Sequence, residues 1–219
     1  MKSEYYPYFR SLTGQIPAEG SPKRGTLPEV FADMGNLDWN RLRNIMNGYI
    51  PAYRKELVLK ISFFFDMDGT VNYWDENGNI YAPHYFRQCR PMWNLIKAIA
   101  LLKAYGLHCY FGTAVINSRK DMMEDKKAWI KEVGLERVPP IFIPYGENKD
   151  DYLLGDYKFL LDDHTPNLEK FSGGCAKYLN GVNHRGKKWK GATIDMNETP
   201  LVMALKIIDY ACKEYEKRA

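Results

Sequence analysis

Two aspartates, Asp66 and Asp68, follow directly after an apolar run and precede Gly69. Residues two apart project to the same side of an extended chain, so both carboxylates are expected to face one ligand. A phosphomonoester dianion repels nucleophiles, and a carboxylate held against Mg²⁺ is a nucleophile that survives beside the required cation. Asp66 is therefore the candidate nucleophile, which would form an aspartyl-phosphate. Asp68 is the candidate acid–base, which protonates the leaving oxygen and then deprotonates the attacking water, and Gly69 permits a tight turn.

Polar residues also follow two later apolar runs. Thr113 ends the segment LHCYFGT, and Lys149 lies in the loop GENKDD after IFIP. Thr113, with backbone N–H groups such as that of Ala114, is expected to bind the phosphoryl oxygens. Lys149 offers a positive charge to those oxygens and to the crowded carboxylates, which lowers the cost of their mutual repulsion.

A second pair of aspartates, Asp162 and Asp163, ends the apolar run KFLLDD. Mg²⁺ prefers octahedral oxygen ligation with several retained waters. The expected protein ligands are Asp66, the backbone carbonyl of Asp68, and one or both of Asp162 and Asp163. The sequence leaves open which aspartate of this pair binds the ion directly.

Each of these residues, taken singly, has an ordinary explanation. Asp-Gly is a common turn dipeptide, and a lone lysine is usually a solvated surface residue. Asp162 and Asp163 could cap a helix that opens at Pro166. Four polar sites at four strand ends, in the order Asp-x-Asp, Thr, Lys and Asp-Asp, are nevertheless typical of an active site for phosphoryl transfer.

The elements that must position these residues alternate between strand and helix. Apolar helical spacing from Met92 to Leu102 ends at Gly106, and Ser118 and Thr165 are predicted helix caps. Alternation of this kind predicts βαβ units in a Rossmann-like, three-layer α/β sandwich with a mainly parallel sheet, whose ligands bind beyond the carboxyl ends of the strands. The five predicted strands are 57–66, 107–113, 141–144, 158–163 and 175–180, and further helices are expected around 38–46, from 118 to 134, and after Thr199-Pro200.

The motifs FFFDMDGT, CYFGT, Lys149 and FLLDD resemble those of the haloacid-dehalogenase superfamily of aspartate-nucleophile phosphatases, and they occur in that family's order. The resemblance covers roughly residues 57–212, and Asp-x-Asp-Gly-Thr is its most specific element. The stretch LLDDHTPNL is also similar to small 5′-nucleotidases of the superfamily. The resemblance implies the same nucleophile, acid–base and Mg²⁺ ligands that the residues themselves suggest.

Members of this superfamily usually carry an inserted cap domain, and this chain has little room for one. The segment VNYWDENGNIYAP holds Asn77-Gly78 between aromatic runs, which predicts a β-hairpin flap. Its aromatic residues, among them Tyr73, Trp74, Tyr85 and Phe86, either stack on a substrate or pack the flap against the body. We expect two regions, a loop-rich and partly helical N-terminal appendage at 1–56 and a phosphohydrolase domain at 57–219. The appendage either covers the pocket or packs on the sheet or on a second subunit, which would make the protein a homo-oligomer.

The charge distribution bears on the partner. The net charge is +4; residues 1–60 carry nine Lys or Arg and six Asp or Glu, which leaves only +1 for the remaining chain. A nearly neutral body argues against sequence-independent nucleic-acid binding. Four cysteines without a Cys-x-x-Cys pair suit a reducing compartment, and no apolar run is long enough for a membrane span, so we expect a cytoplasmic protein.

Three functions fit these observations. The leading one is Mg²⁺-dependent hydrolysis of a small phosphorylated metabolite, with a nucleotide or deoxynucleotide among the candidates. A phosphatase for a nucleic-acid or other macromolecular phosphate would use the basic loop 180–191, with Arg185, Lys187, Lys188 and Lys190. A non-catalytic binding or scaffold protein would retain the fold, but loss of Asp66 is what that hypothesis predicts, and Asp66 is present.

Overall fold

The computed structural model describes residues 39–73, 78–182 and 189–218. The chain divides into two compact units, 1–35 and 36–219, and all described residues belong to the second. What the sequence analysis expected of the first 38 residues, including a cover over the pocket or a subunit contact, lies outside the described residues.

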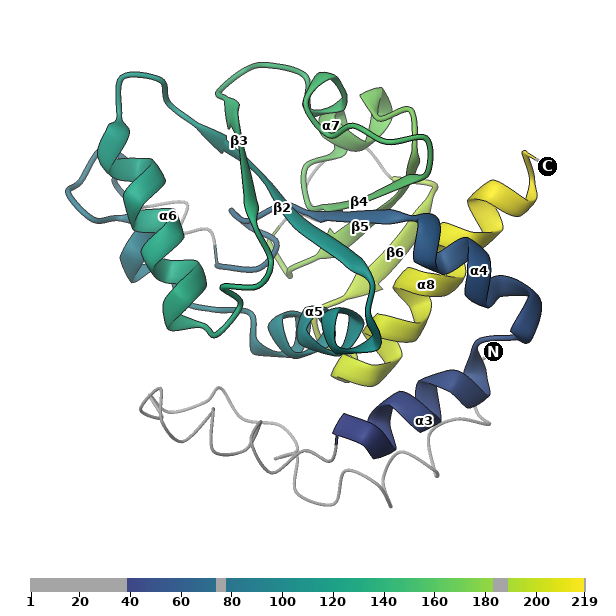
Figure 1. Cartoon of the computed structure of the whole chain (residues 1–219). Coiled ribbons are helices and arrows are strands. Elements are labelled where there is room, and N and C mark those ends of the chain that lie inside the picture. Colours follow the sequence, from purple (N-terminus) through teal and green to yellow (C-terminus); the bar gives the residue numbers. More distant parts are fainter. Residues whose placement is uncertain (1–38, 74–77, 183–188, 219) are drawn as a thin grey trace. The chain divides into compact units, whose positions relative to one another are not determined.

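Helices and strands alternate along the described chain, which confirms the predicted α/β class (Figure 1). The elements are α3 (Trp39–Tyr49), α4 (Ala52–Lys60), β1 (Ser62–Phe65), η1 (Phe86–Gln88), α5 (Trp93–Tyr105), β2 (His108–Val115), α6 (Lys120–Glu132), β3 (Pro140–Pro144), η2 (Lys149–Asp151), β4 (Lys158–Asp162), α7 (Thr165–Lys170), β5 (Gly174–Leu179), β6 (Ala192–Asp195) and α8 (Pro200–Glu216).

The strands form one sheet in the order β3-β2-β1-β4-β5-β6, and every pair is parallel. The prediction of five strands was wrong by one, because β6 was not recognised. This strand has only four residues, and only Ile194 among them is buried. It therefore lacks the continuous apolar run that marks a central parallel strand.

The apolar run 57–66 spans two elements, whereas the sequence analysis predicted one strand. Residues 57–60 complete helix α4, which buries Val58, and β1 begins only at Ser62. Arg54 holds this helix to α8 through hydrogen bonds to both carboxylate oxygens of Glu216 and to Asp209. Helix α4 therefore packs on the body of the fold.

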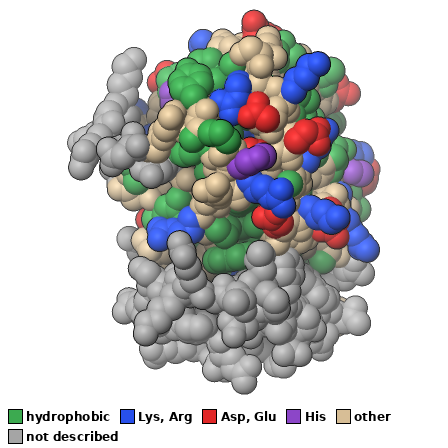
Figure 2. Space-filling model, turned by 90° about the vertical axis from the view of Figure 1, so that its left-hand side faces the viewer, with side chains coloured by type: hydrophobic (Ala, Val, Ile, Leu, Met, Phe, Trp, Pro, Cys, Tyr) green, Lys and Arg blue, Asp and Glu red, His purple; other side chains and the backbone are tan. Residues whose placement is uncertain are grey.

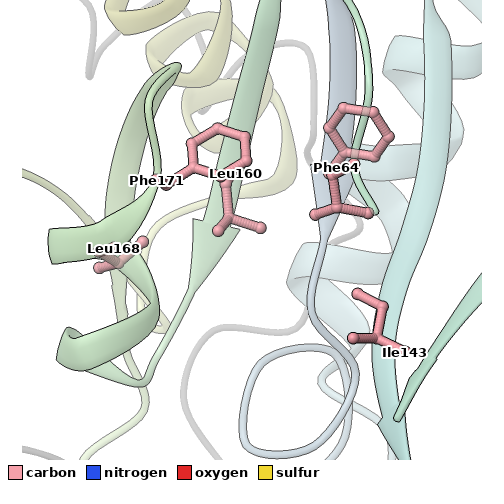
Figure 3. Packing of buried hydrophobic residues seen from close by; sticks show 6 residues of the cluster. Phe64, Ile143, Leu160, Leu168 and Phe171 are labelled. Atoms are coloured by element: carbon pink, nitrogen blue, oxygen red, sulfur yellow. The ribbon is translucent and has the colours of Figure 1, made fainter. Parts of the chain in front are cut away.

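Helices cover both faces of the sheet. Helices α5 and α8 lie side by side, α3 contacts α5, and α7 contacts β4 and β5 from the other layer (Figure 1). Phe64 of β1 points into the layer with α7, where it packs with Leu160, Leu168 and Phe171 (Figure 3). Phe63 alternates to the opposite face and is also fully buried. The sheet is thus apolar on both faces at β1.

Two predicted helix caps are displaced by one residue. The cap of α6 is Arg119 and not Ser118, and the cap of α7 is His164, with Thr165 already inside the helix. Thr199 does precede α8, and Gly106 ends α5 with a left-handed φ of 102°, as glycine at that position favours. None of the described helices combines the length and the apolar character that a membrane span requires.

The segment between β1 and α5 is compact and lacks strands in its described part. Asn72 forms isolated bridges with Asp68 and Pro91, and η1 follows. The predicted hairpin at 71–83 was wrong for the described residues of that segment, which form turns and an isolated bridge; Trp74 and Asn77 lie outside the described residues. Phe86 is buried and packs with residues of β2 and α6, so it belongs to the core.

Candidate active site

The strand register places the aspartates that end β1 and β4 side by side. Phe65 pairs with Phe111 of β2 on one side and with Leu161 of β4 on the other. The next residues, Asp66 and Asp162, therefore lie level with each other on adjacent strands. The Asp66 N–H donates to the carbonyl of Leu161 at 2.9 Å, which fixes the backbone of the candidate nucleophile.

Three carboxylates meet at this point. Each of Asp66, Asp162 and Asp163 offers an oxygen, and these oxygens all lie within 4.8 Å of one another. Lys149, the first residue of η2, places its ammonium 2.5 Å from Asp66 Oδ1 and 2.7 Å from Asp162 Oδ2. The side chains of Asp162 and Lys149 are almost completely buried. The segment between β3 and β4 thus supplies the positive charge for a cluster formed at the ends of β1 and β4.

The electrostatics of the cluster show an excess of negative charge. Burial raises the pKa of Asp66 well above its usual range. The Lys149 ammonium lowers this pKa, and the nearby carboxylates of Asp162, Asp68 and Asp163 raise it further. Burial alone would lower the pKa of Lys149, but Asp162 and Asp66 outweigh it and raise that pKa. Burial and Asp162 raise the pKa of Asp163 to about 7. One ammonium does not balance three carboxylates, so the donor set fits a divalent cation.

A second buried lysine, Lys126 of α6, serves the other half of the site. Its ammonium donates to Asp68 Oδ2 at 2.5 Å, to Thr113 Oγ1 at 2.7 Å and to the Ala114 carbonyl at 2.8 Å. These bonds use all three N–H groups of the ammonium. The ring of Phe86 lies 4.7 Å from the nitrogen and closes it off from another side. Each lysine holds one part of the site: Lys149 bonds the candidate nucleophile Asp66, and Lys126 bonds the candidate acid–base Asp68.

The sequence analysis did not identify Lys126. Its signal was a lysine on the apolar stripe of an amphipathic helix, between the buried residues Met122 and Trp129. Lysine is rarely fully buried unless it is paired, so a lysine at this position indicates a buried hydrogen-bond acceptor beside it. Lys127, one residue further, is half-exposed; its ammonium pairs with Glu124 and lies 5.8 Å from the centre of the Phe142 ring.

Gly69 allows the loop after β1 to pass closely under Asp163. Its φ is +85°, and its N–H donates to the carbonyl of Asn72. A Cβ at this position would lie 2.5 Å from Asp163 Oδ2. Thr70 also contacts Asp163, because its hydroxyl lies 3.3 Å from Oδ1 and accepts the Asp163 N–H at 3.1 Å. The turn is therefore shaped around the second aspartate pair.

The structure brings together every residue that the sequence analysis placed in the site, listed here in chain order: Asp66, Asp68, Thr113, Ala114, Lys149, Asp162 and Asp163. Ala114 takes part through its carbonyl oxygen. His164 is exposed, and its backbone N–H donates to Asp162 Oδ1. Of the basic residues in the loop 180–191, Lys190 is exposed, and Arg185, Lys187 and Lys188 lie outside the described residues.

Neither a protein-family model nor a curated protein matches this chain.

Proposed function

We propose that the protein is a Mg²⁺-dependent phosphomonoester hydrolase of the haloacid-dehalogenase type, which acts through an aspartyl-phosphate at Asp66. One observation carries the proposal: the Asp66 carboxylate ends a central strand within 4.8 Å of two further carboxylates and 2.5 Å from a buried ammonium. That arrangement suits a nucleophile that must work beside a cation and an anionic ester.

The residues that would hold the ion are Asp66, Asp162 and Asp163, with the backbone carbonyl of Asp68. When bound, Mg²⁺ would neutralise charge on the phosphoryl oxygens and keep the buried carboxylates ionised. Thr113 Oγ1 accepts a hydrogen bond from Lys126, so its own proton remains to be donated to a phosphoryl oxygen.

The reaction has two displacements. In the first, an Asp66 carboxylate oxygen forms a bond to phosphorus, the bond to the ester oxygen breaks, and that oxygen takes a proton from Asp68. In the second, Asp68 takes a proton from water, the water oxygen bonds to phosphorus, and the bond to Asp66 breaks. Inorganic phosphate leaves, and both aspartates return to their starting states.

The surface around the site supports a small substrate. In Figure 1, β1 runs from α4 toward the left of the view, and Figure 2 faces that side of the molecule. Figure 2 shows lysine and arginine beside aspartate and glutamate there, and no continuous basic track among the described side chains. Mixed charge suits a phosphorylated metabolite, such as a nucleotide, better than a polynucleotide backbone. The cysteine spacing favours a cytoplasmic setting.

The test is hydrolysis of p-nitrophenyl phosphate by the full chain, with Mg²⁺ and with EDTA. We expect activity only with Mg²⁺, and a loss of at least about 1,000-fold for Asp66→Asn. Asp156→Asn is the matched control, because Asp156 is exposed and precedes β4 at the opposite edge of the sheet.

Trapping the intermediate separates the proposal from a scaffold role. A ³²P-labelled substrate should leave a hydroxylamine-sensitive label on the wild type and none on Asp66→Asn. Full activity of Asp66→Asn would contradict the proposal. A wild type that binds Mg²⁺ but hydrolyses neither nucleotides, sugar phosphates nor 3′-phosphorylated oligonucleotides would favour a binding protein.

A further inference from the structure

Asn180 links three parts of the candidate site. It is the first residue after β5 and is 4% exposed. Its Nδ2 donates to the Gly69 carbonyl at 2.7 Å and to Asp163 Oδ2 at 3.1 Å. Its Oδ1 accepts the N–H of Val182 at 3.0 Å. One carboxamide therefore joins the turn after the nucleophile, the second aspartate pair and the loop after β5.

The two carboxylates of the second pair are held by different groups. Asp162 accepts from Lys149 at 2.7 Å and from Asn167 at 2.9 Å. Asp163 is oriented by the hydroxyl of Thr70 and the carboxamide of Asn180. Both of these groups are neutral, so they orient the carboxylate without adding a positive charge to it.

We propose that Asn180 is a positioning residue for the divalent cation, which orients Asp163 and sets the distance between Asp163 and the turn at Gly69. The inference rests on the proposed function, because it takes the three-carboxylate cluster as the cation site. Removal of a group that orients a metal ligand typically lowers metal affinity about 10- to 100-fold. Asn180 does not contact the reacting atoms, so its loss should weaken the cation and spare turnover once the cation is saturating.

The experiment titrates Mg²⁺ against wild-type full chain, Asn180→Ala and the milder Asn180→Ser. Thermal unfolding temperature and p-nitrophenyl phosphate hydrolysis are measured at each Mg²⁺ concentration. We expect the Mg²⁺ concentration at half-effect to rise about 10- to 100-fold in Asn180→Ala by both readouts. The activity of the variant should return to within about threefold of wild type at saturating Mg²⁺. Asn197→Ala is the control, because Asn197 is exposed and bonds only to Asp195 among the described residues.

The readouts separate the outcomes. An unchanged Mg²⁺ midpoint in both Asn180 variants would overturn the inference, as would a wild type that shows no Mg²⁺-dependent thermal shift. A fall in activity that Mg²⁺ does not restore would assign Asn180 a purely structural role and would also overturn it. If the wild type binds Mg²⁺ but hydrolyses no phosphomonoester, the proposed function fails, and the thermal shifts still decide the role of Asn180.

Discussion

The ammonium of Lys126 lies 2.5 Å from Asp68 Oδ2, and the Lys126 side chain is fully buried. The Asp68 side chain is 18% exposed, so a carboxylate that solvent can partly reach is bonded to a buried ammonium. Asn72 Nδ2 holds the other oxygen of Asp68 at 3.3 Å. One oxygen of the candidate acid–base is thus fixed by Lys126 of α6, and the other by Asn72 of the turn that contains Asp68.

Lys126→Met should therefore impair leaving-group protonation more than substrate binding. A general acid contributes about 100- to 10,000-fold where the leaving oxygen is a poor leaving group. We expect a fall in kcat of about 100-fold with glycerol phosphate, and of about tenfold or less with p-nitrophenyl phosphate, whose leaving group needs little protonation. Steady-state kinetics with both substrates measure this difference.

Lys127→Met is the matched control for this substitution, because Lys127 is the next residue and is half-exposed. Its kinetics should equal those of the wild type. An equal loss with both substrates in Lys126→Met would mean that Lys126 does not act through Asp68.

Gly69→Ala should damage both the fold and the cation site. A non-glycine residue with positive φ costs roughly 1–2 kcal/mol, and the added Cβ would also lie 2.5 Å from Asp163 Oδ2. We expect a lower unfolding temperature and a Mg²⁺ midpoint raised at least about tenfold. Gly106→Ala separates the two effects, since φ there is +102° and a Cβ would meet no atom within 4 Å. Equal Mg²⁺ midpoints in the two variants would show that an atom added at Gly69 beside Asp163 does not disturb the cation site.

The raised pKa of Asp163 predicts how pH and Mg²⁺ act together on stability. The folded protein binds a proton at Asp163 up to about pH 7, whereas an unfolded aspartate has already lost it near pH 4. This group therefore lowers the free energy of unfolding as pH rises from about 4 to 7. Because Mg²⁺ binds the ionised carboxylate, the ion should raise the unfolding temperature more at pH 8 than at pH 5, by about 5 °C or more at saturation.

Thermal unfolding at both pH values, with and without Mg²⁺, measures this linkage. Asp163→Asn should show a smaller loss of stability between pH 5 and pH 8 without metal, and a smaller Mg²⁺ effect at pH 8. A Mg²⁺ shift that is equal at the two pH values in the wild type would contradict the assignment of Asp163 to the cation site.

Arg54 provides a test of the fold apart from the site. Its guanidinium forms a two-pronged pair with Glu216 at 2.6 and 2.7 Å, and its side chain is only 13% exposed. Arg54→Met should cost about 1–2 kcal/mol and lower the unfolding temperature by about 5 °C. Lys60→Met, which removes a pair between exposed residues, should change it by no more than about 1 °C. An Mg²⁺ midpoint that moves in Arg54→Met would indicate that α4 influences the site.

Local patterns in the sequence were sufficient to predict the class of fold and most of the candidate site. Apolar runs that end in polar residues identify central parallel strands and, with them, the edge where Asp66, Thr113 and Asp162 must meet. Helical spacing and glycine located α5 and its end. These features depend on residues within a few positions of one another, and so they can be read without knowledge of the packing.

Two features of the fold could not be predicted from the sequence alone. They are the boundary between α4 and β1, and the strand β6. Residues 57–60 are as apolar as the strand that follows, and only the packing of Val58 and the pairing of Arg54 with α8 distinguish the helix. Strand β6 exists because β5 offers it an edge to pair with, and its own four residues carry little preference.

Lys126 and Asn180 show the same limit in the site itself. The spacing 122, 126, 129 placed Lys126 on a buried stripe, but only the folded chain brings Asp68, which lies 58 residues away, to its ammonium. Asn180 and Asp163 come from adjacent strands that a helix separates in sequence, and Gly69 lies 111 residues from Asn180. Which groups carry charge, and which strand ends bear them, follows from the order of residues along the chain. Which lysine pairs with which carboxylate follows from the folding, because that pairing depends on distances of a few ångströms between distant segments.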